Sequence, residues 1–265
     1  MAVKMSQLMN IIEELAPLEV AEDWDNVGLL TGRRNSSIRR VLITLDVLDQ
    51  VIDEAIASGA DAIISHHPLI FTPIKRITDG NPLENRLLRL IENKICLYTA
   101  HTNMDAAQGG LNDMLFDVLD LTERKYICES KPGVFAGRAG MIPKPIKLTE
   151  FAKFVQGKLN LPTATYCGNG NIIVHKIGLA AGSTADSNFF WAARDAGCDV
   201  FVTSDIKYHA AQTAADIGIS LVDATHYGSE AIFVQGLKNY LEKHLPQIEF
   251  IASKIDGQVF KNACL

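Results

Sequence analysis

The sequence contains no apolar run close to the ~20 residues that a membrane-spanning helix requires. Its first residues, Met-Ala-Val-Lys-Met-Ser, also lack the apolar core of a secretory signal. No Cys-x-x-Cys pair occurs among the five cysteines, at positions 96, 128, 167, 198 and 264, and an odd number without pairing spacing is typical of reduced thiols. We therefore expect a soluble cytoplasmic protein that makes no membrane contact.

Positive charge is scarce relative to negative charge. The 25 lysines and arginines face 31 aspartates and glutamates, which gives a formal net charge of −6 at pH 7. Nucleic acid binding needs a basic surface, so we do not expect a nucleic acid partner. A basic cluster does occur, but it is short and local: Arg33, Arg34, Arg39 and Arg40. The sequence also lacks a His-Glu-x-x-His motif and any cysteine spacing typical of a zinc site.

The most informative stretch is an apolar run that ends in two histidines, Asp61-Ala-Ile-Ile-Ser-His66-His67-Pro68. It predicts a buried strand over residues 63–67, and Pro68 ends the hydrogen-bond ladder. Adjacent side chains on a regular strand point to opposite faces, so both imidazoles can serve one site only if the backbone turns there. The histidines are candidate metal ligands at a strand end, although ordinary strand-capping histidines fit the same pattern.

The chain repeats this pattern once. In the first copy, a strand at 41–45 and a helix lead to Gly59-x-Asp61 and the strand that ends in the histidines. In the second copy, a strand from residue 176 and a helix lead to Gly197-x-Asp199 and a strand that ends in Ser204-Asp205. The repeat predicts an α/β fold with two lobes, residues 1–130 and 131–265, packed as one unit. In the second lobe we expect a strand at 135–141 followed by a proline-rich turn.

A histidine and a carboxylate four residues apart also occur twice. His101-x-x-x-Asp105 follows the strand-like run at 95–100, and His226-x-x-x-Glu230 follows the run at 219–224. Positions i and i+4 of a helix share one face. Alone, the second pair also fits a solvated helix start whose glutamate complements the helix dipole. The matching first pair favours the interpretation as a site.

Together these residues exceed what one catalytic zinc uses, because that ion takes three protein ligands and a water. The full set is His66, His67, His101, Asp105, His226 and Glu230. It fits two metal ions ~3.5–4 Å apart, in a cleft where the polar strand ends of the two lobes face each other. Mixed imidazole and carboxylate ligands suit divalent Zn, Fe, Mn or Ni rather than Ca or Mg. Such a site predicts hydrolytic chemistry, with a remaining histidine or aspartate as general acid or base.

Three other segments carry candidate binding residues. The polar loop at 22–28 contains Trp24, and it is either a simple turn or a loop that faces the site. The loop at 178–186 contains Ser183 and could hold a phosphate at a helix start; a simple Ser or Thr N-cap fits it as well, and it is not a Walker A loop. Lys207 and His209 follow a second-lobe strand, where they could meet an anionic substrate or form a polar strand end.

The sequence resembles the Nif-three-like dinuclear metal-centre family, some of whose members bear the GTP cyclohydrolase 1 type 2 name. The resemblance spans nearly the whole chain and is carried by Trp24-Asp-Asn-Val-Gly-Leu, Ser65-His-His-Pro-Leu-Ile-Phe, Ala100-His-Thr-Asn-Met-Asp-Ala-Ala-Gln-Gly-Gly, Ser204-Asp-Ile-Lys-Tyr-His209 and Asp223-Ala-Thr-His-Tyr-Gly-Ser-Glu230. It implies two intertwined α/β repeats, a di-metal centre and a toroidal homohexamer. The ligands that it implies are His66, His67, Asp105, His226 and Glu230, with His101 beside the metals as a further ligand or a proton carrier.

Two classes of function follow. The first is a dinuclear-metal-dependent hydrolase for a nucleotide or similar phosphorylated compound, and the resemblance implies ring hydrolysis of the GTP cyclohydrolase type at C8 of guanine. In that case His101 or His209 would move protons, and Trp24, Lys207 and Ser183 would contact the substrate. The second is a non-catalytic metal-binding or regulatory interaction protein. A di-metal phosphoesterase is a further alternative, because paired metals also serve phosphoryl transfer.

Overall fold

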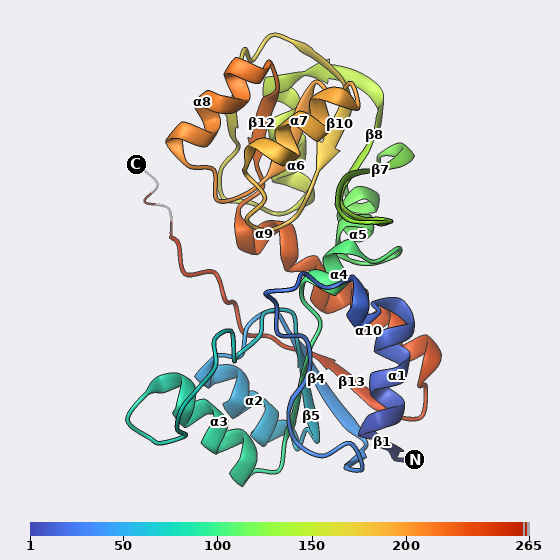
Figure 1. Cartoon of the computed structure of the whole chain (residues 1–265), viewed down its shortest axis with the longest axis vertical. Helices are drawn as coiled ribbons and strands as arrows, with labels where there is room; N and C mark the ends of the chain where they lie inside the picture. Colours follow the sequence, from blue (N-terminus) through green and yellow to red (C-terminus); the bar gives the residue numbers. More distant parts are fainter. Residues whose placement is uncertain (262, 264–265) are drawn as a thin grey trace. The chain divides into compact units, whose positions relative to one another are not determined.

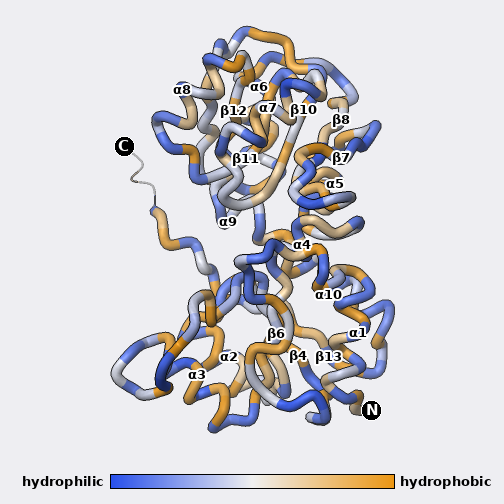
Figure 2. Tube along the Cα trace, viewed as in Figure 1, coloured by the Kyte–Doolittle hydropathy of each residue, from blue (hydrophilic) through white to orange (hydrophobic). Residues whose placement is uncertain are grey.

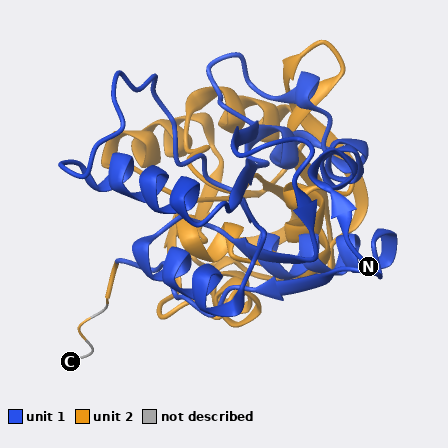
Figure 3. Ribbon diagram, turned by 90° about the horizontal axis from the view of Figure 1, so that it is seen from below, with its two compact units in different colours: residues 1–108, 233–259 blue, residues 109–232, 260–265 orange. Residues whose placement is uncertain are grey.

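The computed structural model describes residues 1–261 and residue 263, so that Cys264 lies outside the described residues. The described chain forms two compact units (Figure 3). The first contains residues 1–108 and 233–259, and the second contains residues 109–232 and the described residues after 259. The chain therefore leaves the first unit, builds the second and returns through a helix and a strand, α10 (Ile232–His244) and β13 (Glu249–Ala252). In this sense the two α/β repeats are intertwined.

The first unit is built on a five-stranded sheet in the order β13-β4-β5-β6-β2. Its strands besides β13 are β4 (Arg40–Thr44), β5 (Ala62–Ser65), β6 (Cys96–Thr99) and β2 (Gly28–Thr31). Neighbouring strands are parallel except β2, which is antiparallel to β6. Parallel strands are buried on both faces and read as continuous apolar runs. Hydrophobic residues accordingly lie along β4 and β6, while hydrophilic residues lie along the outer loops (Figure 2).

Helices cover both faces of this sheet. The helical segments besides α10 are α1 (Met5–Leu15), η1 (Leu18–Val20), α2 (Asp49–Ser58), α3 (Pro82–Glu92) and α4 (Thr102–Ala106). α2 and α3 lie on one side of the sheet, and α1 and α10 lie on the other (Figure 1). On the α2–α3 side, Leu42, Ile63 and Leu97 of the strands pack with Ile52 and Leu90 of the helices. A short antiparallel ribbon completes the unit: β1 (Val3–Lys4) and β3 (Ser37–Ile38).

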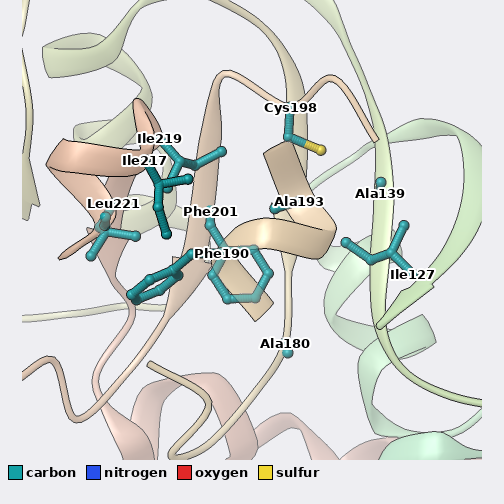
Figure 4. Packing of buried hydrophobic residues seen from close by; sticks show 11 residues of the cluster. Ile127, Ala139, Ala180, Phe190, Ala193, Cys198, Phe201, Ile217, Ile219 and Leu221 are labelled. Carbon is teal, nitrogen blue, oxygen red and sulfur yellow. The ribbon is translucent and has the colours of Figure 1, made fainter. Parts of the chain in front are cut away.

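The second unit is built on a six-stranded sheet in the order β7-β8-β10-β11-β12-β9. The strands are β7 (Thr122–Lys131), β8 (Val134–Lys147), β9 (Thr165–Cys167), β10 (Ile173–Leu179), β11 (Val200–Thr203) and β12 (Ser220–Asp223). The helices are α5 (Leu111–Val118), α6 (Leu148–Lys158), α7 (Ser187–Asp195), α8 (Tyr208–Ile217) and α9 (His226–Glu230). Phe190 of α7 and Ile217 of α8 pack against Phe201 and Leu221 of the central strands (Figure 4).

The internal repeat predicted from the sequence is present in the order of the elements. The series α1-β2-β4-α2-β5-α3-β6-α4 matches α6-β9-β10-α7-β11-α8-β12-α9, with an antiparallel edge strand in the same place. The Gly-x-Asp motif has one role in both copies. Gly59 and Gly197 have positive φ angles of 66° and 75° just after a helix, which glycine adopts without strain. The carboxylates of Asp61 and Asp199 then each accept two backbone N–H groups of the neighbouring parallel strand, at the start of β4 in the first copy and within β10 in the second.

Two expectations differ from the structure in detail. The proline-rich turn after residue 141 is wrong, because β8 continues to Lys147 and pairs with β10 beyond the prolines. Its register with β10 shifts between Val174 and Lys176, and such an irregularity tolerates residues that lack an N–H group. The predicted boundary between two lobes, at residues 130 and 131, stays a prediction. It does not coincide with the boundaries of the compact units, because β7 and β8 pair with each other across it.

Within the part of the chain that the structure describes, no helix combines the length and the apolar character needed to span a bilayer. The cytoplasmic location expected from the sequence stays a prediction.

Candidate metal centre

The paired histidines lie just beyond the end of β5. The strand ends at Ser65, two residues earlier than predicted. The backbone N–H groups of His66 and His67 donate to the carbonyls of Thr44 (3.2 Å) and Leu45 (3.0 Å). The two rings have centroids 5.1 Å apart, a separation too short for side chains on opposite faces of a regular strand. The backbone turn that the sequence required for a shared site is therefore present.

A third imidazole joins this pair from the next strand. β6 ends at Thr99, and His101 follows as the N-cap residue of α4. Its ring centroid lies 5.1 Å from that of His66 and 5.6 Å from that of His67. One ring nitrogen of each histidine lies within 4.8 Å of those of the other two. The ends of two neighbouring parallel strands thus bring together three candidate ligands that are distant in sequence.

Each of the three rings is held at Nδ1 by an oxygen atom. The donor–acceptor pairs are His66 with the Ala100 carbonyl (2.9 Å), His67 with Asp46 Oδ1 (2.8 Å) and His101 with Asp25 Oδ1 (2.9 Å). A carbonyl or carboxylate oxygen can only accept, so Nδ1 carries the hydrogen and Nε2 of the neutral ring keeps its lone pair. Metal-ligating histidines commonly have this arrangement, because an oxygen partner behind the ring fixes its orientation and tautomer.

Asp105 places a carboxylate at the same cluster. The first turn of α4 is fixed, because Asn103 accepts the N–H of His101 and donates to the carbonyl of Ala16. Asp105 Oδ1 lies 3.6 Å from Nε2 of His66, a distance longer than a hydrogen bond. Two ligands of one ion at bond lengths of about 2.0–2.2 Å can stand this far apart. Three imidazoles and a carboxylate therefore suit a divalent transition metal, and the donor set fits the predicted ions.

Asp25 connects the loop at 22–28 to this cluster. Its fully buried carboxylate accepts from His101 and from both the N–H (3.0 Å) and the hydroxyl (2.5 Å) of Thr102. Burial alone would raise the pKa of Asp25, but the hydrogen bonds from His101 and Thr102 to the charged form outweigh it and lower the pKa to about 2. The preceding residue, Trp24, lies beside His101, so the loop faces the histidines.

The second unit contains the other predicted pair of ligands. His226 Nδ1 donates to Asp205 Oδ2 (2.8 Å), which repeats the carboxylate support seen in the first unit. His226 Nε2 lies 3.1 Å from Oε2 of Glu230, and the Glu230 side chain is only 4% exposed. Asp205 and Thr225 have positive φ angles of 53° and 55°. Such strain in residues other than glycine persists where the surroundings fix it, as they often do at functional sites.

A tight loop at Gly182 packs against this pair. Gly182 has a φ of +68°, and a Cβ atom there would overlap Oε1 of Glu230. The loop is fixed on both sides: the Gly182 N–H donates to Ser229 Oγ (3.1 Å), its carbonyl accepts from Ser204 Oγ (2.6 Å), and the Ala181 N–H donates to Asn112 (2.7 Å). Glycine at this position therefore lets the buried carboxylate approach the backbone closely.

The two His-x-x-x-carboxylate pairs are one residue out of structural register. Ala100 and Ala224 occupy the same place, since each donates its N–H to the end of the neighbouring strand. His101 is the N-cap of α4, whereas Thr225 is the N-cap of α9 and His226 is its first residue. The sequence comparison therefore found the right type of element but paired the residues with an offset of one.

The remaining predicted residues lie on the surface of the second unit. Ser183 and Lys207 are exposed, and the ring of the exposed His209 bonds Gln212 (3.0 Å) in its own helix. The start of α7 is capped by Asp186, whose carboxylate accepts the N–H groups of Asn188 and Phe189. These N–H groups thus already have an anionic partner; the helix start is capped, but by Asp186 and not by the expected serine or threonine. Roles for Ser183, Lys207 and His209 in substrate binding or proton transfer stay predictions.

Sequence reasoning did not identify the residues that support the imidazoles. Asp25 and Asp205 were part of segments considered above and Asp46 directly follows the predicted strand at 41–45, but no spacing rule links them to a histidine 21 or 76 residues away. Asp46 and Asp205 follow apolar strands closely, and that position was the available signal. Gly182 carried no signal beyond the turn preference of glycine.

Comparison with known proteins finds a matching family and solved structures with the same fold. Residues 3–258 match the family model described as Duf34/NIF3 (NGG1p interacting factor 3). A Clostridium perfringens relative named GTP cyclohydrolase 1 type 2 homolog is 34% identical over 257 residues, covering 95% of this chain and 97% of the relative. Staphylococcus aureus protein SA1388 is 29% identical, with a TM-score of 0.90 and coverage of 98% and 99% of the two chains. The Bacillus cereus protein related to NIF3 has the same TM-score and coverage, and its 24% identity shows the fold alone.

Proposed function

Because the chain belongs to the Duf34/NIF3 family, we propose that it is a dinuclear-metal-dependent hydrolase of a nucleotide or similar phosphorylated compound. The main support is the cluster of His66, His67 and His101, in which every Nδ1 atom has an oxygen acceptor. The name of the Clostridium perfringens relative supports ring hydrolysis of GTP as the specific reaction.

We propose that two divalent ions of Zn, Fe, Mn or Ni are held by His66, His67, Asp105, His226 and Glu230. Neutral imidazoles and carboxylates are the ligand types that these metals share. When bound, such a metal pair acidifies water and polarises a carbonyl or phosphoryl oxygen, which is hydrolytic chemistry. The buried Glu230 and the half-buried Asp105 add negative charge that favours cations over a neutral ligand.

The chain's own residues would position the reacting groups and move protons. Asp46 and Asp205 accept from Nδ1 of His67 and His226, which leaves Nε2 of each ring on the side away from its supporting aspartate and available to a metal. Asp25, ionised at neutral pH, holds His101 in the same way, so Nε2 of His101 is the atom that would take or return a proton.

Other residues complete the proposal. His209 is the second candidate proton carrier, and Trp24, Lys207 and Ser183 are candidate substrate contacts. Lys207 would supply a cation for a phosphate group.

Metal analysis combined with a turnover assay tests this function. Protein purified without added metal is loaded, analysed for metal content and incubated with GTP, and the ring-opened product is detected by mass. We expect about two ions per chain, with both metal content and turnover reduced in His226→Ala. His175→Ala changes an exposed histidine of β10 and should leave both unchanged. Turnover that is equal in wild type and His226→Ala would contradict ring hydrolysis, and a panel of phosphoesters tests the phosphoesterase alternative.

A non-catalytic role is the second candidate, because the family description, NGG1p interacting factor 3, names an interaction with another protein. In that case the protein would bind metal with the same ligands and act as a regulatory partner. Metal content that depends on His226, together with no turnover of GTP or phosphoesters, would favour this role over the hydrolase.

We also propose self-association as a toroidal homohexamer. Light scattering coupled to gel filtration should then give about six times the chain mass of 29.0 kDa. A mass of one chain at micromolar concentration would contradict the hexamer without affecting the metal proposal.

A further inference from the structure

Two aromatic side chains of the first unit remain largely exposed beside the histidine cluster. Trp24 is 59% exposed and Phe71 is 53% exposed. Their ring centroids are 5.7 Å apart with an angle of 46° between the planes. The Trp24 ring also meets the His101 ring edge-on, at 6.0 Å and 74°. The aromatic pair is therefore part of the surroundings of the candidate metal centre.

Hydrogen bonds fix the two loops that carry these rings. Trp24 is followed by Asp25, whose carboxylate is bonded to His101 and Thr102. The next residue, Asn26, donates from its side-chain amide to the carbonyl of Ile70 (2.6 Å), immediately before Phe71. Both aromatic residues thus extend from backbone that is tied to the cluster and to the other loop. A ligand that binds the two rings therefore has little additional backbone to order, and this preorganisation reduces the entropy cost of binding.

The chemistry of the pair favours a flat ring as its ligand. Aromatic faces attract other aromatic rings through stacking, which removes apolar area from water and needs no hydrogen-bond partner. A phosphate group has no apolar face and gains nothing from this contact. The carboxylate of Asp25 is fully buried and bonded, so the exposed side chains of this loop are the Trp24 ring and its neighbour Asp23.

On the basis of the function proposed above, we propose that Trp24 and Phe71 form a ring-binding platform that takes the face of a planar heteroaromatic group, such as a nucleobase. The bound ring lies on the exposed side of the pair, next to His101. Trp24 and Phe71 are then specificity-determining residues, because they select substrates that contain a flat ring over plain sugar phosphates.

Tryptophan fluorescence offers a direct measurement of this contact. The sequence has two tryptophans, and Trp191 lies on α7 of the second unit. In a Trp191→Phe background the signal comes from Trp24 alone. The probes are guanosine 5′-monophosphate, which has the ring, and ribose 5-phosphate, which lacks it. We expect saturable quenching by the nucleotide and none by the sugar phosphate, with the metal content of the variant equal to that of wild type.

Calorimetric titration with the same nucleotide tests each residue. Trp24→Ala and Phe71→Ala should each weaken binding by roughly tenfold or more, the range for loss of one stacking contact. Trp24→Phe and Phe71→Tyr keep a ring and should retain most of the affinity. Unchanged metal content in all four variants separates loss of stacking from loss of the histidine cluster.

The outcomes distinguish the platform from the hydrolase. Quenching without turnover would support the platform and contradict ring hydrolysis. Turnover with no response of Trp24, or with equal nucleotide affinity in wild type and Trp24→Ala, would overturn the platform and leave the hydrolase standing. A Trp24→Ala variant that dissociates into smaller assemblies while binding the nucleotide as wild type does would likewise overturn it, and would assign the ring to a contact between copies of the chain.

Discussion

Replacing Gly182 with alanine is expected to displace the Glu230 carboxylate and weaken metal binding. Gly182 has a φ of +68°, so alanine there carries the cost of a left-handed backbone, about 1–2 kcal/mol. The new Cβ would in addition overlap Oε1 of Glu230. Relief of such overpacking costs about 1–3 kcal/mol more, because Ser229 and Ser204 hold the loop in place.

Gly197→Ala is a matched control for this variant. Gly197 has a φ of +75°, and a Cβ atom there would meet nothing within 4 Å. It therefore carries the same backbone strain without the overlap. In a chain of about this size, each kcal/mol of lost stability lowers the melting temperature by about 2–4 °C. The backbone strain of about 1–2 kcal/mol in Gly197→Ala should therefore lower it by about 2–8 °C, and Gly182→Ala should lower it by more.

Metal affinity is the decisive measurement for this pair of variants. Competition with a chromophoric chelator gives the dissociation constant of the metal for wild type and for each variant. We expect Gly182→Ala to bind about 10- to 100-fold more weakly, as is typical when a ligand loses its supporting contacts, and Gly197→Ala to bind as wild type does. Equal affinities in the two variants would refute the placement of Glu230 among the ligands.

Three further predictions concern side chains whose partners are clear. Asp46→Asn removes the anionic acceptor of His67 and should weaken metal binding by about 10- to 100-fold; unchanged affinity in the chelator assay would contradict its positioning role. Arg138→Met removes the buried guanidinium bonded to Asp113, whose remaining cation is Arg124 at 3.4 Å, and should lower the free energy of unfolding in urea by up to about 3–5 kcal/mol, with most of the loss recovered when Asp113 is also replaced by Asn. Asp49 has a lowered pKa because of its hydrogen bond from an arginine, so its contribution is present at neutral pH and lost as pH falls through the carboxyl range. Asp49→Asn should thus lower the melting temperature slightly at pH 6 and progressively less as the pH falls below the ordinary carboxyl pKa of 3.8, and a difference that does not shrink on acidification would contradict this sign.

The elements that could be predicted from sequence are those with strong local patterns. The helix over Asp49–Ser58 ends at a glycine. The strands β4, β5 and β6 are short apolar runs, as is typical of parallel strands that are buried on both faces of the sheet. The repeat was visible because Gly-x-Asp serves one structural purpose in both copies. β7 was missed because most of its residues are polar and half are exposed, so that its pairing with β8 is what makes it a strand.

The sequence predicted which histidines come together at the candidate site, but not the geometry that holds them there. His66, His67 and His101 each follow an apolar strand, and strand ends on one edge of a parallel sheet meet in space. The oxygen atoms that hold their rings come from a backbone carbonyl and from two aspartates in other segments. Which aspartate faces which histidine depends on how the loops pack, and no local sequence pattern encodes that choice.

The return of the chain to its first unit has a consequence for biosynthesis. β13 forms the edge of the sheet beside β4, and α10 buries Phe233, Leu237 and Leu241 in that unit. A ribosome must therefore release residues up to Ala252 before the earliest part of the chain can complete its sheet, whereas residues 109–232 are available together sooner. The unit encoded in the middle of the chain can finish folding first, and the N-terminal segment must wait for the last strand, in contrast to the usual order of synthesis.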